Sequence, residues 1–553
     1  MSVAQTPFGA DIRAVPAFRS APWPLIAAAA LMALACALQT AFGAFGDVSW
    51  MLTIGEKWLA GGAPYVDFVE TNPPAAIALY LPAVEISRLT GLRAEAAVAA
   101  MGLAGALASL AYARSILRRG APAWSPGPVA SVIALAGLAV LPGRTFDERD
   151  FFVALLMLPA LALWTVRAGG VRPAARDTVI CGLLIAAALA VKPPYATIPL
   201  VAAPYLWRRT GLAKLLRCGE FWLAGLAFAL YVAAVFAFFP AYFQSVAPTL
   251  AIAYLPVRES IGALFANSAT VGVLATLAVA AFLLRGRILT PSFAIPALAA
   301  LGGLLAFFIQ GKGWLYQALP AAMFAAVLAG LALEARALAS RRLALAAAAA
   351  ALTFALGAFA ALPPLPLAFA LAALAHFAAA PRGETVDARI AGIAEMFLAA
   401  LVGALAAFYA PPFPGPTAAF KQALREIGPH PRIAAIAPGL GAGFPLTRQV
   451  DGDWVLTRQG LLMAAGARVL LSRAAGDRAA LEKVIEEDRT VLAADLSREK
   501  PDAILVSRSN PALHDWIVND PDIAAVLAGY RLAASNDGKD WPLDLYRRKW
   551  RAP

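Results

Sequence analysis

Residues 45–74 read FGDVSWMLTIGEKWLAGGAPYVDFVETNPP and follow directly on an apolar run long enough to cross a membrane. The stretch brings four carboxylates close to the end of that run: Asp47, Glu56, Asp67 and Glu70. The next segment, PAAIALYLPAVEISRLT at 74–90, is apolar but carries two prolines and two charged residues. Whether 74–90 crosses the membrane decides the side on which every later segment lies, because each crossing moves the chain to the other face.

The composition is that of a membrane protein. Of the 553 residues 61% are hydrophobic and only 14% are charged, which predicts a chain that crosses the membrane many times. The net charge of +12 comes from pairs of basic residues between apolar runs, a pattern typical of membrane topology and not of nucleic-acid binding. Three cysteines beside apolar segments imply no disulfide framework. Residues 1–22 precede the first apolar run without a cleavage signal, so we expect a retained cytoplasmic N-terminus.

About thirteen segments have the length and apolarity of candidate spans: 23–43, 94–116, 126–142, 151–166, 177–192, 194–207, 220–239, 263–284, 291–309, 314–335, 343–361, 364–380 and 390–410. Alternate loops hold most of the arginines and lysines, which places those loops in the cytoplasm. This alternation holds only if 74–90 does not span. We therefore expect 44–93 to be an external loop with two helices, 48–60 and 74–90, lying at the membrane surface.

The composition changes after residue 410. Residues 411–416, PPFPGP, predict a stiff linker, and 411–553 have the mixed charge of a soluble domain. Within it RIAAIAP (432–438), ARVLLS (467–472) and DAILVS (502–507) predict strands, and 477–496 predicts a helix. The fold class expected is therefore a polytopic α-helical membrane domain over 23–410, followed by a small α/β domain outside the cytoplasm.

Candidate site residues come from five segments that this topology puts on the outer side of the membrane. They are Asp47, Asp67 and Glu70 in the first loop; Asp147, Glu148, Arg149 and Asp150 in GRTFDERDFF (143–152); Lys192 in VKPPY; Tyr254 and Arg258 in the loop 240–260; and Lys312, Tyr316 and Gln317 in QGKGWLYQALP (310–320). Each also has a plain structural interpretation, such as a helix cap for Asp150, a snorkelling lysine or an aromatic belt. Two acidic clusters on one face of the membrane favour a shared site.

These residues suit transfer of a sugar from a lipid phosphate. The lipid tail would remain in the bilayer, and Lys192, Lys312 and Arg258 would bind the phosphate. A partly desolvated carboxylate makes a better base, so we expect Asp47 to activate the acceptor, with Asp147 or Glu148 binding sugar hydroxyls, the acceptor or a metal. A divalent cation, Mg²⁺ or Mn²⁺, held by carboxylates alone is compatible with the sequence, which has no His/Cys metal motif.

The order of motifs also resembles a family. An acidic residue after the first span, WLAGGAPYVDF, NPP, LPGRTFDERDFF, KPPY, QGKGWLYQALP and a terminal α/β domain are similar to the bacterial C-type glycosyltransferases, which include lipid A aminoarabinose transferases and protein O-mannosyltransferases. The resemblance implies a polyprenyl-phosphate-linked sugar donor, inversion at the anomeric carbon, a glycan, lipid or protein acceptor, and a site on the periplasmic face of the inner membrane. By position Asp47 matches the catalytic aspartate. Asn72 and Gln317 depart from the residues usual in the family.

Two other functions fit a membrane protein of this size. A transporter or flippase of a lipid-linked substrate would show internal repeats and charges at mid-membrane, and neither pattern is evident in the sequence. A polysaccharide polymerase or ligase would typically place its large external loop late in the chain. The acidic first loop favours the transferase.

Overall fold

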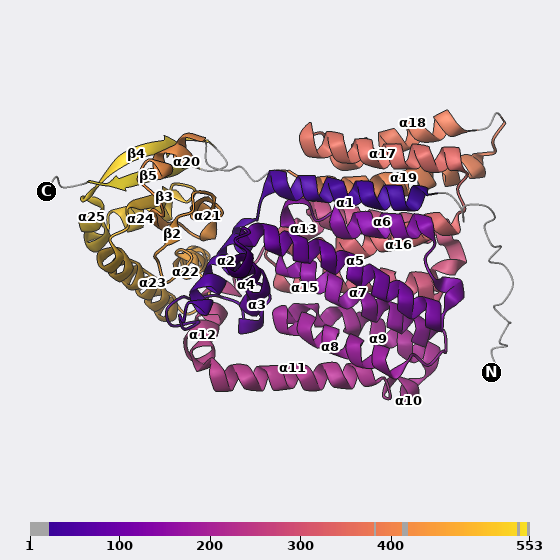
Figure 1. Cartoon of the computed structure of the whole chain (residues 1–553), viewed down its shortest axis with the longest axis horizontal. Helices are drawn as coiled ribbons and strands as arrows, with labels where there is room; N and C mark the ends of the chain where they lie inside the picture. Colours follow the sequence, from indigo (N-terminus) through magenta and orange to yellow (C-terminus); the bar gives the residue numbers. More distant parts are fainter. Residues whose placement is uncertain (1–21, 381–382, 412–417, 539–541, 550–553) are drawn as a thin grey trace.

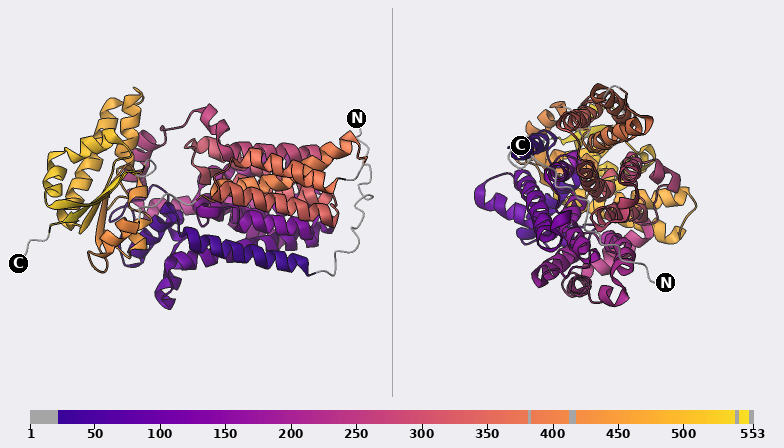
Figure 2. Two further views of the ribbon diagram at one scale, coloured as in Figure 1. Left: turned by 90° about the horizontal axis from the view of Figure 1, so that it is seen from above. Right: turned by 90° about the vertical axis from the view of Figure 1, so that its right-hand side faces the viewer.

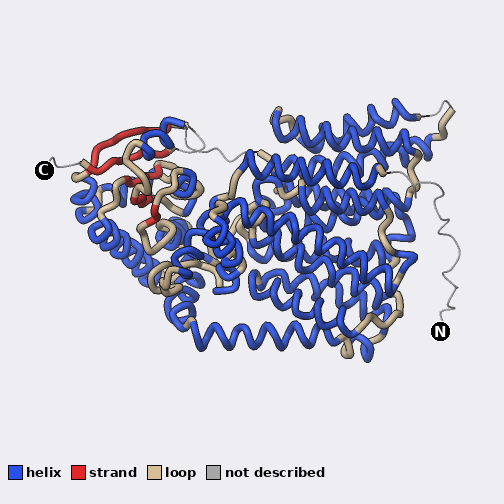
Figure 3. The backbone as a smooth tube through the Cα atoms, in the orientation of Figure 1, coloured by secondary structure: helices blue, strands red, loops and turns tan. Residues whose placement is uncertain are grey.

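The computed structural model describes residues 22–380, 383–411, 418–538 and 542–549. Long helices lie side by side, and a small domain that contains the strands is attached at one end of them (Figures 1 to 3). The predicted cytoplasmic segment before Pro22 and all of the predicted linker 411–416 except Pro411 fall outside the described residues.

Each of the thirteen predicted segments forms a helix. The bounds are α1 Trp23–Phe42, α5 Ala94–Gly120, α6 Pro128–Ala139, α7 Arg149–Ala168, α8 Ala175–Val191, α9 Thr197–Thr210, α11 Gly219–Phe238, α14 Ser268–Leu284, α15 Pro291–Gln310, α16 Leu319–Ala335, α17 Ser340–Phe359, α18 Pro364–Ala379 and α19 Val386–Tyr409. Among the described residues, nine helical segments are long and apolar enough to cross a membrane. The shorter α6, α8, α9 and α18 are not among the nine, so thirteen crossings remain a prediction.

The helices differ in how much of their surface other helices cover. Helix α7 is buried along most of its length, whereas α11 (Figure 1) and the indigo helix α1 (Figure 2, left) lie at the edge of the bundle with most of their side chains uncovered. On α11 the uncovered residues are large and apolar, among them Trp222, Leu226 and Phe236. A helix with such a surface is suited to lipid, because the same side chains would be unfavourable in water.

The first loop contains three short helices: α2 Gly46–Leu59, α3 Pro74–Ala78 and α4 Leu81–Thr90. With 14, 5 and 10 residues, none approaches the ~20 residues of a membrane span. The single helix expected over 74–90 is wrong, because the chain turns at 79–80 and restarts with Pro82 in the first turn of α4. The loop therefore lies against the end of the bundle.

Shorter elements join the long helices. They are η1 Pro122–Trp124, η2 Gly143–Thr145, η3 Pro193–Ala196, α10 Leu212–Leu215, η4 Tyr242–Val246, α12 Ala247–Thr249, η5 Leu250–Tyr254, α13 Ile261–Ala266, η6 Arg285–Leu289 and η7 Leu315–Ala318. Of these, η2, η3, η5 and η7 carry candidate site residues or lie within two residues of one.

The C-terminal domain is built on a five-stranded sheet of order β2-β1-β3-β5-β4. Strands β2 Asp453–Trp454, β1 Arg432–Ile436 and β3 Ala503–Ser507 are parallel, and β5 Leu543–Arg548 is antiparallel to β3 and to β4 Tyr530–Asn536. The helices are α20 Ala418–Arg425, η8 Leu440–Ala442, α21 Leu446–Gln449, α22 Leu462–Ser472, α23 Arg478–Glu499, α24 Pro511–Val518 and α25 Pro521–Leu527. The strands expected at 432–438 and 502–507 and the helix at 477–496 are confirmed.

The strand expected at 467–472 is wrong, because these residues end helix α22. The buried side chains of α22 are Met463, Ala464, Ala467 and Leu470, a helical spacing that continues upstream of the segment interpreted as a strand. This face packs on α23 and on η5. The second of these contacts joins the C-terminal domain to the loop that precedes α13.

Candidate active site

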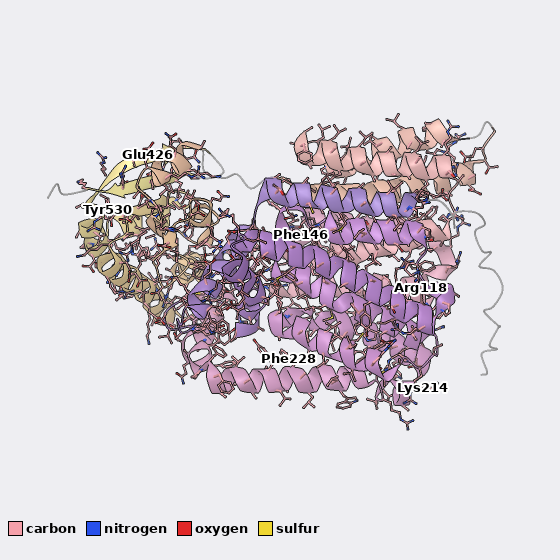
Figure 4. The ribbon with its side chains drawn as sticks, in the orientation of Figure 1. Arg118, Phe146, Lys214, Phe228, Glu426 and Tyr530 are labelled. Atoms are coloured by element: carbon pink, nitrogen blue, oxygen red, sulfur yellow. The ribbon has the colours of Figure 1, made fainter. Side chains whose placement is uncertain are left out.

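The candidate residues lie at the end of the bundle that faces the C-terminal domain. Phe146, next to the acidic turn, is at this end in Figure 4, whereas the basic loop residues Arg118 and Lys214 are at the opposite end. The turn before α7, the ends of α8 and α15 and the first loop all meet here. Segments separated by more than 100 residues in sequence therefore supply one site.

Arg149 is at the centre of the site. It is the first residue of α7, and only 4% of its side chain is exposed. Its guanidinium lies 3.6 Å from the Asp47 carboxylate and 3.7 Å from that of Glu70. Both separations are long for hydrogen bonds, and its Nε and Nη1 find no hydrogen-bond partner among the described residues. Arg149 thus keeps donors available between two carboxylates.

Asp47 is the accessible carboxylate of this pair. Its side chain is 15% exposed, against 2% for Glu70. Burial raises the pKa of Asp47 and the charge of Arg149 lowers it, with a net increase. A carboxylate with a raised pKa is the better proton acceptor, so the geometry suits a general base.

Glu70 is held by several donors. The indole Nε1 of Trp50 donates to its Oε2 at 2.5 Å, and the backbone N–H of Asn72 and the hydroxyl of Thr71 donate to its Oε1 at 2.9 and 3.0 Å. The side-chain amide of Asn72 also donates to Oε1. With its oxygens already engaged, Glu70 is better placed to orient Arg149 than to bind substrate.

Lys192 and Asp150 form a buried ion pair beside this group. The Lys192 Nζ lies 2.6 Å from Asp150 Oδ2, and Tyr195 donates its hydroxyl hydrogen to Asp150 Oδ1. The Lys192 ammonium is also 4.9 Å from the centre of the Tyr316 ring. Gln317 is buried nearby, and its Oε1 has no partner within the described part of the chain. The Lys192 ammonium at the site is therefore paired with the Asp150 carboxylate.

Asp147 and Glu148, the two alternative carboxylates for binding sugar hydroxyls, the acceptor or a metal, have different surroundings. Glu148 is fully buried, and neither of its carboxylate oxygens has a hydrogen-bond partner among residues that the structure describes. Burial and then the charge of Asp47 raise the pKa of Glu148. Burial alone raises the pKa of Asp147, whose Oδ1 lies against Gly102 on α5. The structure thus brings Glu148 to the cluster and directs Asp147 away from it.

Lys312, Tyr254 and Arg258 form a second group. Lys312 Nζ donates to the carbonyls of Tyr254 and Val257, the latter at 2.5 Å, and lies 4.0 Å from the centre of the Tyr254 ring. Burial and the nearby Arg258 lower the pKa of Lys312 to about 8. Arg258 is exposed and donates to the carbonyl of Phe308 at 2.8 Å. These cations fasten the loop 240–260 to the end of α15.

An aromatic row connects the two groups. The ring centre of Tyr254 is 6.3 Å from that of Trp314, which is 5.8 Å from that of Tyr316. Lys312 lies over the first of these rings and Lys192 over the last. The two lysines predicted for phosphate binding are therefore at opposite ends of one aromatic surface.

Asp67 also lies apart from the cluster. It is exposed, and its Oδ2 accepts a hydrogen bond of 2.7 Å from the backbone N–H of Ala63, which closes a turn. Trp50 and Tyr195 were not among the predicted residues. Tyr195 directly follows the KPP motif, whereas the role of Trp50 depends on a partner 20 residues away and has no local signal.

The site does not resemble a metal centre. No group of three or more His, Cys, Asp or Glu side chains that could hold a metal ion occurs among the described residues. Instead Arg149 and Lys192 lie between the carboxylates. Among the described residues the cluster is therefore arranged as ion pairs and does not fit the divalent cation considered from the sequence.

The fold and the site define a polytopic helical membrane protein whose charged cluster lies under a C-terminal α/β domain. Neither a family model nor a curated protein sequence matches the chain. A solved structure does match: ArnT from Cupriavidus metallidurans bound to undecaprenyl phosphate, with a TM-score of 0.54 and 18% identity over 95% of this chain and 98% of the ArnT chain. The fold predicted from the order of motifs is confirmed by this similarity.

Proposed function

We propose that this protein is a membrane glycosyltransferase that takes its sugar from a polyprenyl phosphate. The observation that carries the proposal is the pairing of Asp47, the accessible carboxylate, with buried Arg149 in a fold shared with ArnT along nearly the whole chain. ArnT was solved with undecaprenyl phosphate bound, and a lipid phosphate is the ligand that a cationic site at a membrane surface suits.

The residues divide between the parts of the reaction. Asp47 takes the proton of an acceptor hydroxyl, and the resulting oxygen forms a bond to the anomeric carbon of the sugar. The bond from that carbon to the phosphate oxygen breaks, and the polyprenyl phosphate leaves with the electron pair. Attack opposite the leaving group inverts the anomeric centre. Asp47 loses its proton again to solvent, which its 15% exposure allows.

The leaving phosphate needs positive charge and hydrogen-bond donors. Arg149 supplies N–H groups that have no acceptor within the described residues, and Lys192 adds a charge beside it. We assign the sugar hydroxyls to Glu148, because both of its oxygens are buried without partners there. We assign Lys312 and Arg258, beyond the aromatic row, to the lipid side of the phosphate.

The positive-inside pattern supports a direction for the site. Basic residues such as Arg118 and Lys214 gather at the end of the bundle opposite the C-terminal domain (Figure 4). We infer that this end faces the cytoplasm of a bacterial inner membrane and that the site and the C-terminal domain are periplasmic. The acceptor is then a glycan, lipid or protein of the cell envelope.

The test is transfer by purified protein in nanodiscs. A panel of undecaprenyl-phosphate hexoses and pentoses is supplied with bacterial envelope extract as the acceptor, and release of undecaprenyl phosphate is measured. We expect Asp47→Asn to lower the rate at least ~100-fold, as loss of a general base does. Asp67→Asn, in the exposed turn, is the matched control and should retain activity. An Asp47→Asn protein that transfers at the wild-type rate would refute the assignment of the base.

A further inference from the structure

The C-terminal domain covers one face of the helix that carries Asp47. Gly46, Trp50, Thr53 and Glu56 follow one another at helical spacing along α2, and each lies against this domain. At Gly46 the approach is so close that an added Cβ would lie 2.6 Å from Leu440 Cδ1 and 3.3 Å from the Phe444 carbonyl oxygen. Asp47 is the next residue, so the C-terminal domain touches the chain beside the proposed base.

Trp50 is seated by aromatic residues of the C-terminal domain. It is fully buried, and its ring centre is 5.4 Å from that of Phe444 and 6.4 Å from that of Trp454, both in edge-to-face geometry. The ring centres of Phe444 and Trp454 are 4.9 Å apart. Gly443 lies against the Trp454 ring, where an added Cβ would be 2.4 Å from it. The orientation of the Trp50 indole is therefore set from outside the membrane domain.

That orientation is transmitted to the charged cluster. The Trp50 Nε1 donates to Glu70 at 2.5 Å, and Glu70 lies 3.7 Å from Arg149, which lies 3.6 Å from Asp47. A hydrogen bond to a carboxylate is stronger than one between neutral groups. Glu70 Oε1, the oxygen nearest Arg149, keeps its bonds from Asn72 and Thr71, so loss of the indole N–H would release Oε2 and let the carboxylate turn about Oε1 beside the guanidinium. Each step of this series is a contact between buried or nearly buried side chains.

We propose that the C-terminal domain is a positioning element of the active site, which acts through Phe444, Trp50 and Glu70 on the Arg149–Asp47 pair. The inference rests on the proposed role of Asp47 and deepens it. Trp50, Phe444 and Glu70 are positioning residues, because none of them needs to touch the reacting atoms. The domain then serves catalysis in addition to covering the site.

Two pairs of matched variants test the proposal. Trp50→Phe keeps an aromatic ring and removes the N–H that holds Glu70. Trp164→Phe is its control, since Trp164 is equally buried in α7 and its N–H has no partner in the part of the chain that is described. Phe444→Leu removes the contact with Trp50. Phe420→Leu is its control, being fully buried in α20 of the same domain.

In the transfer assay we expect Trp50→Phe to lower kcat at least ~10-fold with donor KM within about twofold, because a misplaced base slows the chemical step. Trp164→Phe should change neither. Hydrogen exchange of the 46–59 segment should increase at least ~3-fold in Phe444→Leu and stay unchanged in Phe420→Leu, because only the first variant loosens α2. Wild-type kcat in Trp50→Phe, or equal effects within either pair, would overturn the positioning role.

Failure of the proposed function is distinguishable from failure of this inference. If the wild-type protein releases no undecaprenyl phosphate from any donor, the transferase assignment fails. The exchange comparison needs no activity and still decides whether the C-terminal domain holds α2. Equal exchange in Phe444→Leu and Phe420→Leu would then overturn the inference, whereas a selective increase in Phe444→Leu would support control of α2 by that domain.

Discussion

Arg448 offers the sharpest test of how the C-terminal domain is attached. Its side chain is 12% exposed and lies 2.6 Å from Glu95 of α5 and 2.8 Å from Glu56 of α2. It also donates to the Thr53 hydroxyl at 3.3 Å. One residue of the C-terminal domain therefore joins that domain to two helices of the membrane domain, one of which carries Asp47.

The two ion pairs differ in how far water screens them. Glu95 is 18% exposed and Glu56 is 43% exposed. Removing one partner of a buried pair costs about 3–5 kcal/mol, whereas an exposed pair contributes about 0–1 kcal/mol. Because Glu95 keeps some contact with water, we expect Arg448→Met to weaken docking by about 2–4 kcal/mol. At about 1.4 kcal/mol per factor of ten, the undocked fraction should increase roughly 30- to 700-fold.

The undocked fraction can be measured by thiol labelling. Leu440→Cys places a thiol where Leu440 packs against Gly46, in a background where exposed Cys36 is replaced by serine. A membrane-impermeant maleimide then reacts at a rate that follows the undocked population when opening is fast. The control is Arg473→Met, which removes an exposed residue with a 3.4 Å contact to the Arg258 carbonyl. Labelling that increases less than about fivefold in Arg448→Met, or as much in the control, would refute the reasoning.

Three further predictions concern charges within the site. Burial and the charge of Asp47 raise the pKa of Glu148, so the stability that its protonated form contributes below the unfolded pKa near 4.5 is lost as the pH increases. The Tm of Glu148→Gln should therefore rise relative to the wild-type Tm between pH 5 and 8. A Tm difference that does not change with pH contradicts this prediction. With a pKa of about 8, Lys312 loses its charge between pH 7 and 9, so binding of undecaprenyl phosphate to the wild-type protein should weaken over that range. Binding to Lys312→Gln should not change with pH over that range, and at pH 7 it should be about tenfold weaker than binding to the wild-type protein. Asp150→Asn leaves Lys192 buried without its partner and should lower the free energy of unfolding by about 3–5 kcal/mol. Adding Lys192→Met should restore part of that loss. A double variant no more stable than Asp150→Asn argues against a stabilising ion pair.

Much of the membrane domain was predictable because apolar length alone predicts a membrane helix. All thirteen candidate segments are helices, and the boundaries differ from the predicted ones by only a few residues in most cases. The errors arose where the length of an apolar segment does not distinguish a strand from a helix, or one helix from two. Residues 467–472 are apolar enough for a strand, but the helical spacing of buried residues starts upstream at Met463. Pro82 divides the segment 74–90 into two helices.

The site was predictable in its composition and only partly in its geometry. Acidic and basic residues on loops of one side were expected to meet, and Asp47, Arg149 and Lys192 do lie in one cluster. The choice between Asp147 and Glu148 depended on a backbone φ of 65° at Asp147, a conformation that no sequence pattern around this residue indicates. Trp50 could not be assigned either, because its partners Phe444 and Trp454 lie about 400 residues away.

The arrangement of charges explains why the base proposed at Asp47 would need so many supporting residues. A carboxylate close to a membrane gains basicity from burial, but burial also favours its protonated form, which cannot accept a proton. Arg149 opposes that effect at Asp47, and it can do so only while Glu70 and the residues behind it hold the guanidinium in place. Glu70 in turn depends on Trp50, and Trp50 on a domain folded outside the bundle. A site in which the basicity of one carboxylate depends on the distance to one buried arginine should therefore respond to any change that moves the C-terminal domain.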